Sequence, residues 1–277
     1  MELKQALEEL ETLQKKMYAY QCASSSLYLD SVTVAPSGTA QGRGVALSIL
    51  AGESHKLFAN QEVGELLDFL TEHSGELTLL QRRQVEELRR RWRQMFRIPA
   101  EEYMAYAQLT NQASDVWHKA KETNDFELFR PVLEELVAFN RKFAGYYDDT
   151  KAPYDALLNE YERGVDMAYL DRFFAAIRER LVPVIRAIGE KEQPDDRFLH
   201  REYPVEQQRR FSDYLMEVLG LDRAHCAIGE TEHPFTLEFN NQDVRITTHY
   251  DPHDVASSMY SVIHEGGHAK YELGIRD

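Results

Sequence analysis

Cysteine, long apolar runs and excess positive charge are all scarce in this chain of 277 residues. Its two cysteines, Cys22 and Cys226, are too few for a disulfide framework, which fits a reducing compartment. No run of 18 apolar residues exists, and the N-terminus lacks the apolar segment of a signal peptide. We therefore expect a soluble, cytoplasmic protein with no membrane partner. The net charge of -15 argues against a nucleic-acid partner, because phosphate binding needs clustered lysine and arginine.

Arginine is concentrated in one segment. Its members are Arg82, Arg83, Arg89, Arg90, Arg91, Arg93 and Arg97. The segment has a helical pattern and also contains Glu86 and Glu87. We interpret these arginines as a solvated helix face with intrachain ion pairs.

Helical periodicity dominates the chain, and the 43% of hydrophobic residues can form a sizeable core. The pattern predicts a mainly α fold in a single domain over residues 1–277. Predicted helices cover residues 3–17, 45–58, 77–96, 99–117, 125–147, 166–188 and 204–219. One segment differs, because Phe235–Phe239 and Val244–Thr248 alternate with period two around the polar residues 240–243. This pattern predicts a small antiparallel β element at about residues 233–250.

The most informative segment is His264-Glu265-Gly266-Gly267-His268, an H-E-x-x-H motif. In a helix, residues four apart share a face, so both imidazoles can reach one metal ion. Glu265 lies about 100° further round, where it can face a metal-bound water without ligating the metal. Zinc lowers the pKa of such a water to about 7, and a carboxylate then takes the proton as the water attacks a carbonyl. His264 and His268 are therefore candidate metal ligands, and Glu265 is the candidate general base.

The motif alone is only moderately specific, and the alternative is a surface helix with two unrelated histidines. The flanking residues favour a helix that begins at Asp251-Pro252, with Asp254 near its N-terminus, and that stops at Gly274. Gly266 and Gly267 each cost about 1 kcal/mol inside a helix. Their presence suits a place where another element or a substrate approaches the backbone closely.

Three motifs in this order resemble the carboxypeptidase Taq family of thermostable metallocarboxypeptidases. His233-Pro234-Phe235 matches the family's H-P-F motif, and residues 243–247 match its D-x-R-x-T motif. Residues 264–269 match its H-E-x-G-H-A helix, and residues 154–164 resemble its Y-D-x-L-L…Y-E-x-G stretch. Three ordered motifs so close together are far more specific than H-E-x-x-H alone.

The resemblance implies a largely helical fold with a deep groove and a small sheet along one wall. It implies removal of single residues from peptide C-termini with one divalent ion, zinc or cobalt, by a homodimer. His264 and His268 would be metal ligands, and Glu265 would be the general base and acid. For His233 and Arg245 it leaves two interpretations open. They line the substrate groove, or His233 is structural and Arg245 forms with Asp243 a structural ion pair that holds the hairpin against the helix.

The chain also departs from this family. Family members are about twice as long, and their third metal ligand is a glutamate in an H-E-S-type motif with no counterpart here. The stretches that would hold the substrate's C-terminal carboxylate are also missing. Glu272 is a poor substitute, because ligands at three successive i+4 positions span about 12 Å, too far for one ion about 2 Å from each. We therefore expect the third ligand to be absent from this chain.

Three hypotheses follow. The chain is the N-terminal half of a zinc-type metallocarboxypeptidase, and alone it has little or no turnover. Alternatively, it is a naturally short, non-catalytic helical protein that binds peptides or other proteins. The third hypothesis is an active enzyme completed by a second chain that supplies the glutamate. We favour the metallocarboxypeptidase lineage.

Overall fold

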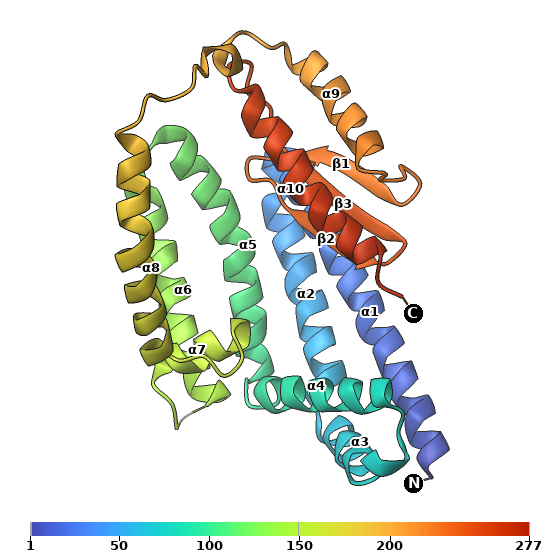
Figure 1. The fold of residues 1–277 in the computed structure, drawn as a ribbon. Helices are drawn as coiled ribbons and strands as arrows, with labels where there is room; N and C mark the ends of the chain where they lie inside the picture. The colour runs from blue at the N-terminus through green and yellow to red at the C-terminus, as the bar shows by residue number, and fades with distance from the viewer. Residues whose placement is uncertain (1, 149, 277) are drawn as a thin grey trace. The chain divides into compact units, whose positions relative to one another are not determined.

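The computed structural model describes residues 2–148 and 150–276 and is mainly helical with one small sheet (Figure 1). The chain divides into two compact units. One unit comprises residues 1–24 and 37–185, and the other comprises residues 25–36 and 186–277. Helix α1 (Leu3–Thr33) therefore contributes residues to both units. The mainly helical class is confirmed, whereas the single domain over residues 1–277 stays a prediction.

The first unit is entirely helical in its described residues. After the first part of α1, it contains α2 (Ala40–Phe58), α3 (Gln61–Glu72), α4 (Leu79–Met95), α5 (Ala100–Thr123), α6 (Phe126–Tyr147), α7 (Pro153–Tyr161) and most of α8 (Met167–Gly189), with short 3-10 turns at Ser37–Thr39 and Ser74–Glu76. The predicted helices of this region are confirmed to within a few residues, but α1 extends well beyond residue 17. Helices α3 and α7 are not among the predicted helices.

Side-chain caps explain several helix starts. The Asn60 side chain accepts a hydrogen bond from the backbone N–H of Val63 and begins α3. Thr78 and Gln81 form a reciprocal capping box at the start of α4. The Asp125 carboxylate accepts from a backbone N–H in the first turn of α6. Each cap satisfies a backbone donor that has no partner within the helix.

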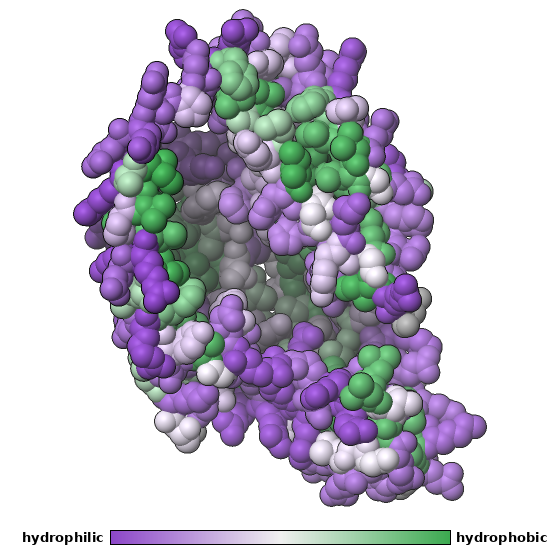
Figure 2. Space-filling view, viewed as in Figure 1, coloured by the Kyte–Doolittle hydropathy of each residue, from purple (hydrophilic) through white to green (hydrophobic). Residues whose placement is uncertain are grey.

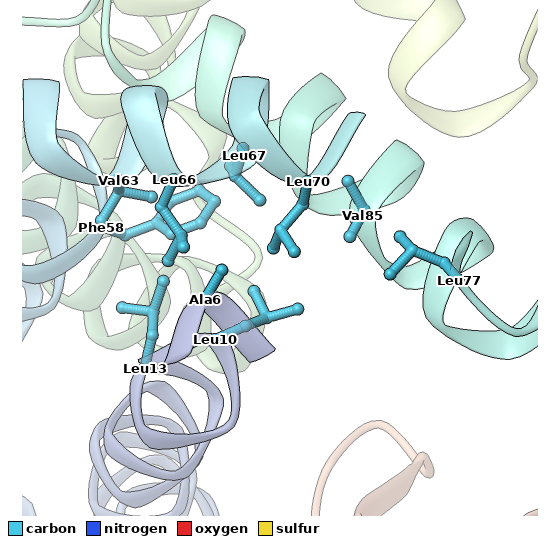
Figure 3. Packing of buried hydrophobic residues seen from close by; sticks show 10 residues of the cluster. All are labelled: Ala6, Leu10, Leu13, Phe58, Val63, Leu66, Leu67, Leu70, Leu77 and Val85. Atoms are coloured by element: carbon cyan, nitrogen blue, oxygen red, sulfur yellow. The ribbon is translucent and has the colours of Figure 1, made fainter. Parts of the chain in front are cut away.

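The largest apolar core lies where α1, α3 and α4 meet (Figure 3). Leu10 from α1 and Leu67 and Leu70 from α3 are almost fully buried there. The apolar residues of α3 recur at spacings of three and four, so one face of this short helix is buried. Each large side chain buried in this way contributes about 1.5–3 kcal/mol.

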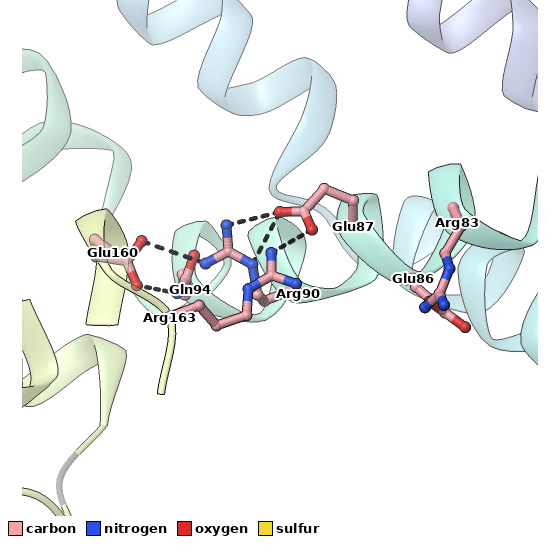
Figure 4. A network of polar contacts seen from close by, with 7 residues as sticks. All are labelled: Arg83, Glu86, Glu87, Arg90, Gln94, Glu160 and Arg163. Atoms are coloured by element: carbon pink, nitrogen blue, oxygen red, sulfur yellow. Dashed lines mark hydrogen bonds and ion pairs between the residues drawn. The ribbon is translucent and has the colours of Figure 1, made fainter. Parts of the chain in front are cut away.

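Ion pairs occupy the arginine-rich face of α4, as the sequence predicts (Figure 4). Arg83 pairs with Glu86 at 2.7 Å. Arg90 pairs with Glu87 at 2.7 Å, and Arg163, which follows α7, reaches the same Glu87 carboxylate. These contacts confirm the interpretation of the segment as a solvated face with intrachain pairs.

Helix α8 is amphipathic but contains no buried residue. Figure 2 shows hydrophobic side chains along it. The exposed apolar side chains are Met167, Tyr169, Phe173, Phe174, Ile177, Leu181, Val184, Ile185 and Ile188. A helix with one apolar face normally buries that face against another element. The apolar face of α8 is thus exposed in this structure.

The second unit combines a three-stranded sheet with two helices, α9 (Val205–Val218) and α10 (Val255–Leu273), and a 3-10 turn at Arg197–His200. The strands are β1 (Cys226–Glu230), β2 (Thr236–Asn240) and β3 (Asp243–Thr248), in the order β1-β3-β2. The predicted antiparallel pair, β2 with β3, is confirmed. The predicted element does not include β1, which pairs with β3 in parallel and makes the sheet mixed. Two strands joined by a short turn are visible in the local pattern, whereas the parallel partner arrives through a long connection.

The two faces of the sheet have different neighbours. Val244 and Ile246 of β3 are fully buried in a core that includes Met216 of α9 and Val262 of α10. Figure 1 shows α10 lying across the strands. On the opposite face, the end of α1 approaches the sheet, and the ring of Tyr28 lies 5.7 Å from that of Phe235. Among the described residues, no helix has the length and apolar character needed to cross a bilayer.

Candidate metal centre on helix α10

Helix α10 begins at Val255, because the Asp254 side chain accepts a hydrogen bond from the backbone N–H of Ser257 at 3.1 Å. The predicted start at Asp251-Pro252 is therefore wrong by three residues. Asp251 instead accepts from the backbone N–H of His253 in the preceding turn. The predicted stop is confirmed, since the helix ends at Leu273 and Gly274 is its C-cap.

A buried polar contact anchors the start of α10 to α9. The amide of Gln208, which is 2% exposed, accepts a hydrogen bond from the Ser258 hydroxyl at 2.7 Å. The same amide donates to the backbone carbonyl of Asp251 at 2.7 Å. Because the Gln208 and Ser258 side chains are buried, this arrangement fixes where α10 begins relative to α9.

The two glycines of the motif have different surroundings. A Cβ atom on Gly266 would lie 2.5 Å from Cδ1 of Leu219, so the backbone of α10 is seated directly against that side chain. A Cβ atom on Gly267 would meet nothing within 4 Å. The expected close approach of another element is thus confirmed for Gly266 and is not seen for Gly267.

His264 and His268 lie together on the exposed face of α10. Their Nε2 atoms are 3.2 Å apart, and their ring centroids are 4.9 Å apart. Two imidazole nitrogens on one tetrahedral zinc ion, each at about 2.0–2.1 Å, would be about 3.3 Å from each other. The two histidines therefore fit a shared metal ion as they stand.

In the described part of the chain, no third candidate ligand joins this pair. Among residues 2–148 and 150–276, no group of three or more histidine, cysteine, aspartate or glutamate side chains could hold a metal ion. The expectation that Glu272 does not complete the site stays a prediction. The described residues thus offer two candidate ligands, one fewer than the three protein ligands that a catalytic zinc site normally has.

Glu265 points away from the exposed face and toward the sheet. The residue is 8% exposed, and its Oε2 atom accepts a hydrogen bond from the Thr236 hydroxyl at 2.7 Å. Its place one residue after His264 is the one that the H-E-x-x-H motif gives to the general base. Its role as that base stays a prediction.

The two groove candidates lie outside α10. His233 is exposed in the segment between β1 and β2. Arg245 of β3 pairs with both carboxylate oxygens of Asp243, at 2.9 and 3.0 Å, and lies 4.4 Å from the ring centroid of Phe239. The pair with Asp243 raises the pKa of Arg245.

The strand register places Arg245 opposite Leu237 of β2 and Ala227 of β1. Because Val244 and Ile246 pack toward α10, Arg245 between them faces the other side of the sheet. This placement favours the structural ion pair over a groove residue beside the histidines. The pair lies within β3, however, and does not hold the hairpin against the helix. Substrate contact by His233 or Arg245 stays a prediction.

Sequence reasoning missed Thr236 as a residue of this site. It follows the H-P-F motif directly and begins β2. Its register partner is Ile246, so it lies on the face of the sheet that α10 covers. The available signal was a polar residue at the start of the strand that precedes the H-E-x-x-H helix. The alternation of polar and apolar residues does not by itself tell which face of the sheet this helix covers.

Comparison with known proteins identifies a matching family and relatives of this chain. The family model of the Carboxypeptidase Taq (M32) metallopeptidase matches residues 9–277. Carboxypeptidase 1 of Bacillus subtilis is 34% identical over 276 residues, which are 99% of this chain and 55% of that protein. Thermostable carboxypeptidase 1 of Pyrococcus furiosus is 30% identical over 262 residues, or 94% of this chain and 52% of that protein.

Solved structures give the same result. The BsuCP crystal structure matches with a TM-score of 0.95 at 33% identity, covering 99% of this chain and 55% of that one. The M32 carboxypeptidase from Deinococcus radiodurans matches with a TM-score of 0.85 at 30% identity, covering 98% and 54%. The chain thus spans about half the length of the relatives it matches.

Proposed function

Because the chain belongs to the Carboxypeptidase Taq (M32) metallopeptidase family, we propose that it carries two metal ligands and the general base of a metal-dependent carboxypeptidase. The observation that carries this proposal is the 3.2 Å separation of the Nε2 atoms of His264 and His268 on the exposed face of α10. This separation matches the demands of one tetrahedral ion.

In this proposal His264 and His268 hold a divalent ion, zinc in the first instance and cobalt as the alternative. When bound, the ion would acidify a water molecule so that it can lose a proton near neutral pH. To bind the ion, each imidazole must be neutral, with its Nε2 atom unprotonated and its ring proton on Nδ1. In the tautomer that makes this 3.2 Å contact a hydrogen bond, one Nε2 atom carries a proton, which metal binding at this pair must displace.

Glu265 then moves the proton. As the water oxygen bonds to the carbon of the last peptide carbonyl, the carboxylate accepts the water's proton and afterwards delivers it to the leaving amine. The C–N bond breaks, and the products are a shortened peptide and a free amino acid. The proposed substrates are therefore peptides with a free C-terminus.

The third ligand and the residues that bind the substrate's carboxylate come, in this proposal, from a part of the family fold that this chain does not span. The chain by itself is expected to show little or no turnover. We also propose that the active form is a homodimer located in the cytoplasm.

The test joins this chain to the part of the Bacillus subtilis relative that the match leaves uncovered. The joined protein is assayed for release of the last residue from a set of short peptides, with and without zinc or cobalt. We expect metal-dependent release that is lost with Glu265→Gln, because glutamine cannot accept the water's proton.

A joined protein that folds and binds metal but releases nothing would contradict the proposed activity. It would favour the other hypothesis, a non-catalytic protein that binds peptides. Release that persists in the Glu265→Gln variant would assign the base to another residue.

A further inference from the structure

One hydrogen bond connects the sheet directly to the proposed general base. The Oγ1 atom of Thr236 lies 2.7 Å from Oε2 of Glu265 and 3.1 Å from the backbone carbonyl oxygen of the same residue. An ionised carboxylate has no proton to give, so the threonine hydroxyl donates to it. A hydrogen bond to a charged group is shorter and about twice as strong as one between neutral groups.

We propose that Thr236 is a positioning residue that holds the Glu265 carboxylate beside the two histidines. This inference rests on the proposed function. A glutamate side chain has three rotatable bonds, and its hydrogen bond to Thr236 selects one of their arrangements. With Oε2 fixed by Thr236, Oε1 is the oxygen that accepts the proton from water.

The position of Thr236 is itself fixed by a neighbouring strand. Thr247 of β3 is fully buried, and its hydroxyl accepts a hydrogen bond from the backbone N–H of Phe235 at 2.8 Å. The same hydroxyl donates to the backbone carbonyl of Phe235 at 3.0 Å, and the Thr247 N–H donates to that carbonyl at 2.9 Å. Both polar groups of the residue before Thr236 are therefore tied to β3.

These contacts and the peptide bond between Phe235 and Thr236 connect the three sequence motifs. Thr247 closes the D-x-R-x-T motif, Phe235 closes H-P-F, and Glu265 belongs to H-E-x-x-H. Thr236 is the link between the sheet and the helix. Removing a group that orients a residue at a metal site reduces activity by about 10–100-fold in comparable cases.

Buried apolar residues surround the hydrogen bond between Thr236 and Glu265. The register partner of Thr236, Ile246, is fully buried, and so is Val262 one turn before Glu265 on α10. Little water is available to replace the threonine hydroxyl as a donor. A carboxylate in such a place needs a partner, because leaving a buried charged group without one is costly.

The first measurement needs no activity and uses the 277-residue chain without metal. The ¹³Cδ resonance of Glu265, assigned by its absence in Glu265→Gln, is recorded by NMR in wild type, Thr236→Val and Thr236→Ser. We expect the signal to shift and broaden in the valine variant and to return to wild-type position and width in the serine variant, which retains the hydroxyl. Thr248→Val is the matched control, since this buried threonine donates to the carbonyl of Ser258, which lies seven residues before Glu265 on α10.

The second measurement uses the joined protein described above. We expect Thr236→Val to lower kcat by about 10–100-fold with KM nearly unchanged, and Thr236→Ser to restore it. A purely structural role would instead lower the fraction of folded enzyme, and Thr248→Val would reproduce the loss. An unchanged Glu265 resonance in Thr236→Val, or unchanged kcat, overturns the inference. A wild-type joined protein without activity overturns the proposed function instead, and the NMR result still decides whether Thr236 orders Glu265.

Discussion

The Nε2 atoms of His264 and His268 face each other at 3.2 Å across one turn of α10. This arrangement is a direct consequence of the i, i+4 spacing in a helix whose opposite face is buried. We expect zinc to bind this pair weakly in the isolated chain, because a site with two protein ligands lacks the affinity of one with three. Calorimetric zinc titration should show one site per chain that disappears in His264→Ala and in His268→Ala. Heat of binding that survives both substitutions would place the ion elsewhere.

The glycine pair of the motif gives a matched stability test. Gly266→Ala places a methyl group 2.5 Å from Cδ1 of Leu219, and overpacking of this kind costs about 1–3 kcal/mol. Gly267→Ala meets nothing and should stabilise the helix by up to about 1 kcal/mol. Urea unfolding of the metal-free chain measures both changes. Equal effects of the two substitutions would mean that Leu219 moves aside freely.

The apolar face of α8 predicts self-association of the isolated chain. Nine large apolar side chains of this helix are exposed, and contiguous patches above a few hundred Å² promote association. Val184→Glu places a charge within this face and should weaken the association seen by analytical ultracentrifugation over a concentration series. Ala175→Glu adds the same charge on the polar face and is the control. A wild-type chain that stays monomeric at high concentration contradicts the prediction.

Stability should fall at acid pH partly because of His55. This residue is 4% exposed, its Nε2 lies 3.1 Å from the Met95 carbonyl, and burial lowers its pKa below the usual 6.5. The unfolded chain therefore binds the proton first as pH falls. The contribution of His55 is present above about pH 6.5 and is lost as pH falls toward its lowered pKa in the folded state.

We expect the free energy of unfolding in urea to decrease more between pH 8 and pH 5 in wild type than in His55→Gln. Glutamine keeps a donor for the Met95 carbonyl and does not titrate. The more exposed His118 gives the control variant His118→Gln, which removes an imidazole without changing the buried contact of His55. Identical pH dependence in wild type and His55→Gln would show that His55 does not contribute to the loss of stability at acid pH.

Substitution of Arg245 distinguishes a residue that binds substrate from one that forms a structural ion pair. Its pair with Asp243 is partly exposed, so we expect Arg245→Gln to cost no more than about 1 kcal/mol of stability. If the residue is structural, the joined protein carrying this substitution should keep its KM for peptides. A KM raised tenfold or more, without loss of stability, would show that Arg245 binds substrate.

The sequence alone determined what depends on neighbours along the chain. Helices appear as apolar residues at spacings of three and four, and the facing of His264 and His268 follows from helical geometry without any other element. The hairpin of β2 and β3 is similarly local. The apolar spacing of α3 was also present in the sequence, at Val63, Leu66, Leu67 and Leu70, although the helix was not predicted.

Only the tertiary structure decided which distant groups meet. Thr236 and Glu265 are 29 residues apart, and nothing in the period of either segment indicates that their side chains touch. The parallel strand β1, the Leu219 side chain beneath Gly266, and the side of the sheet that Arg245 faces are likewise settled by packing. Local periodicity tells which residues share a face, but the neighbour of that face depends on how the whole chain buries its apolar surface.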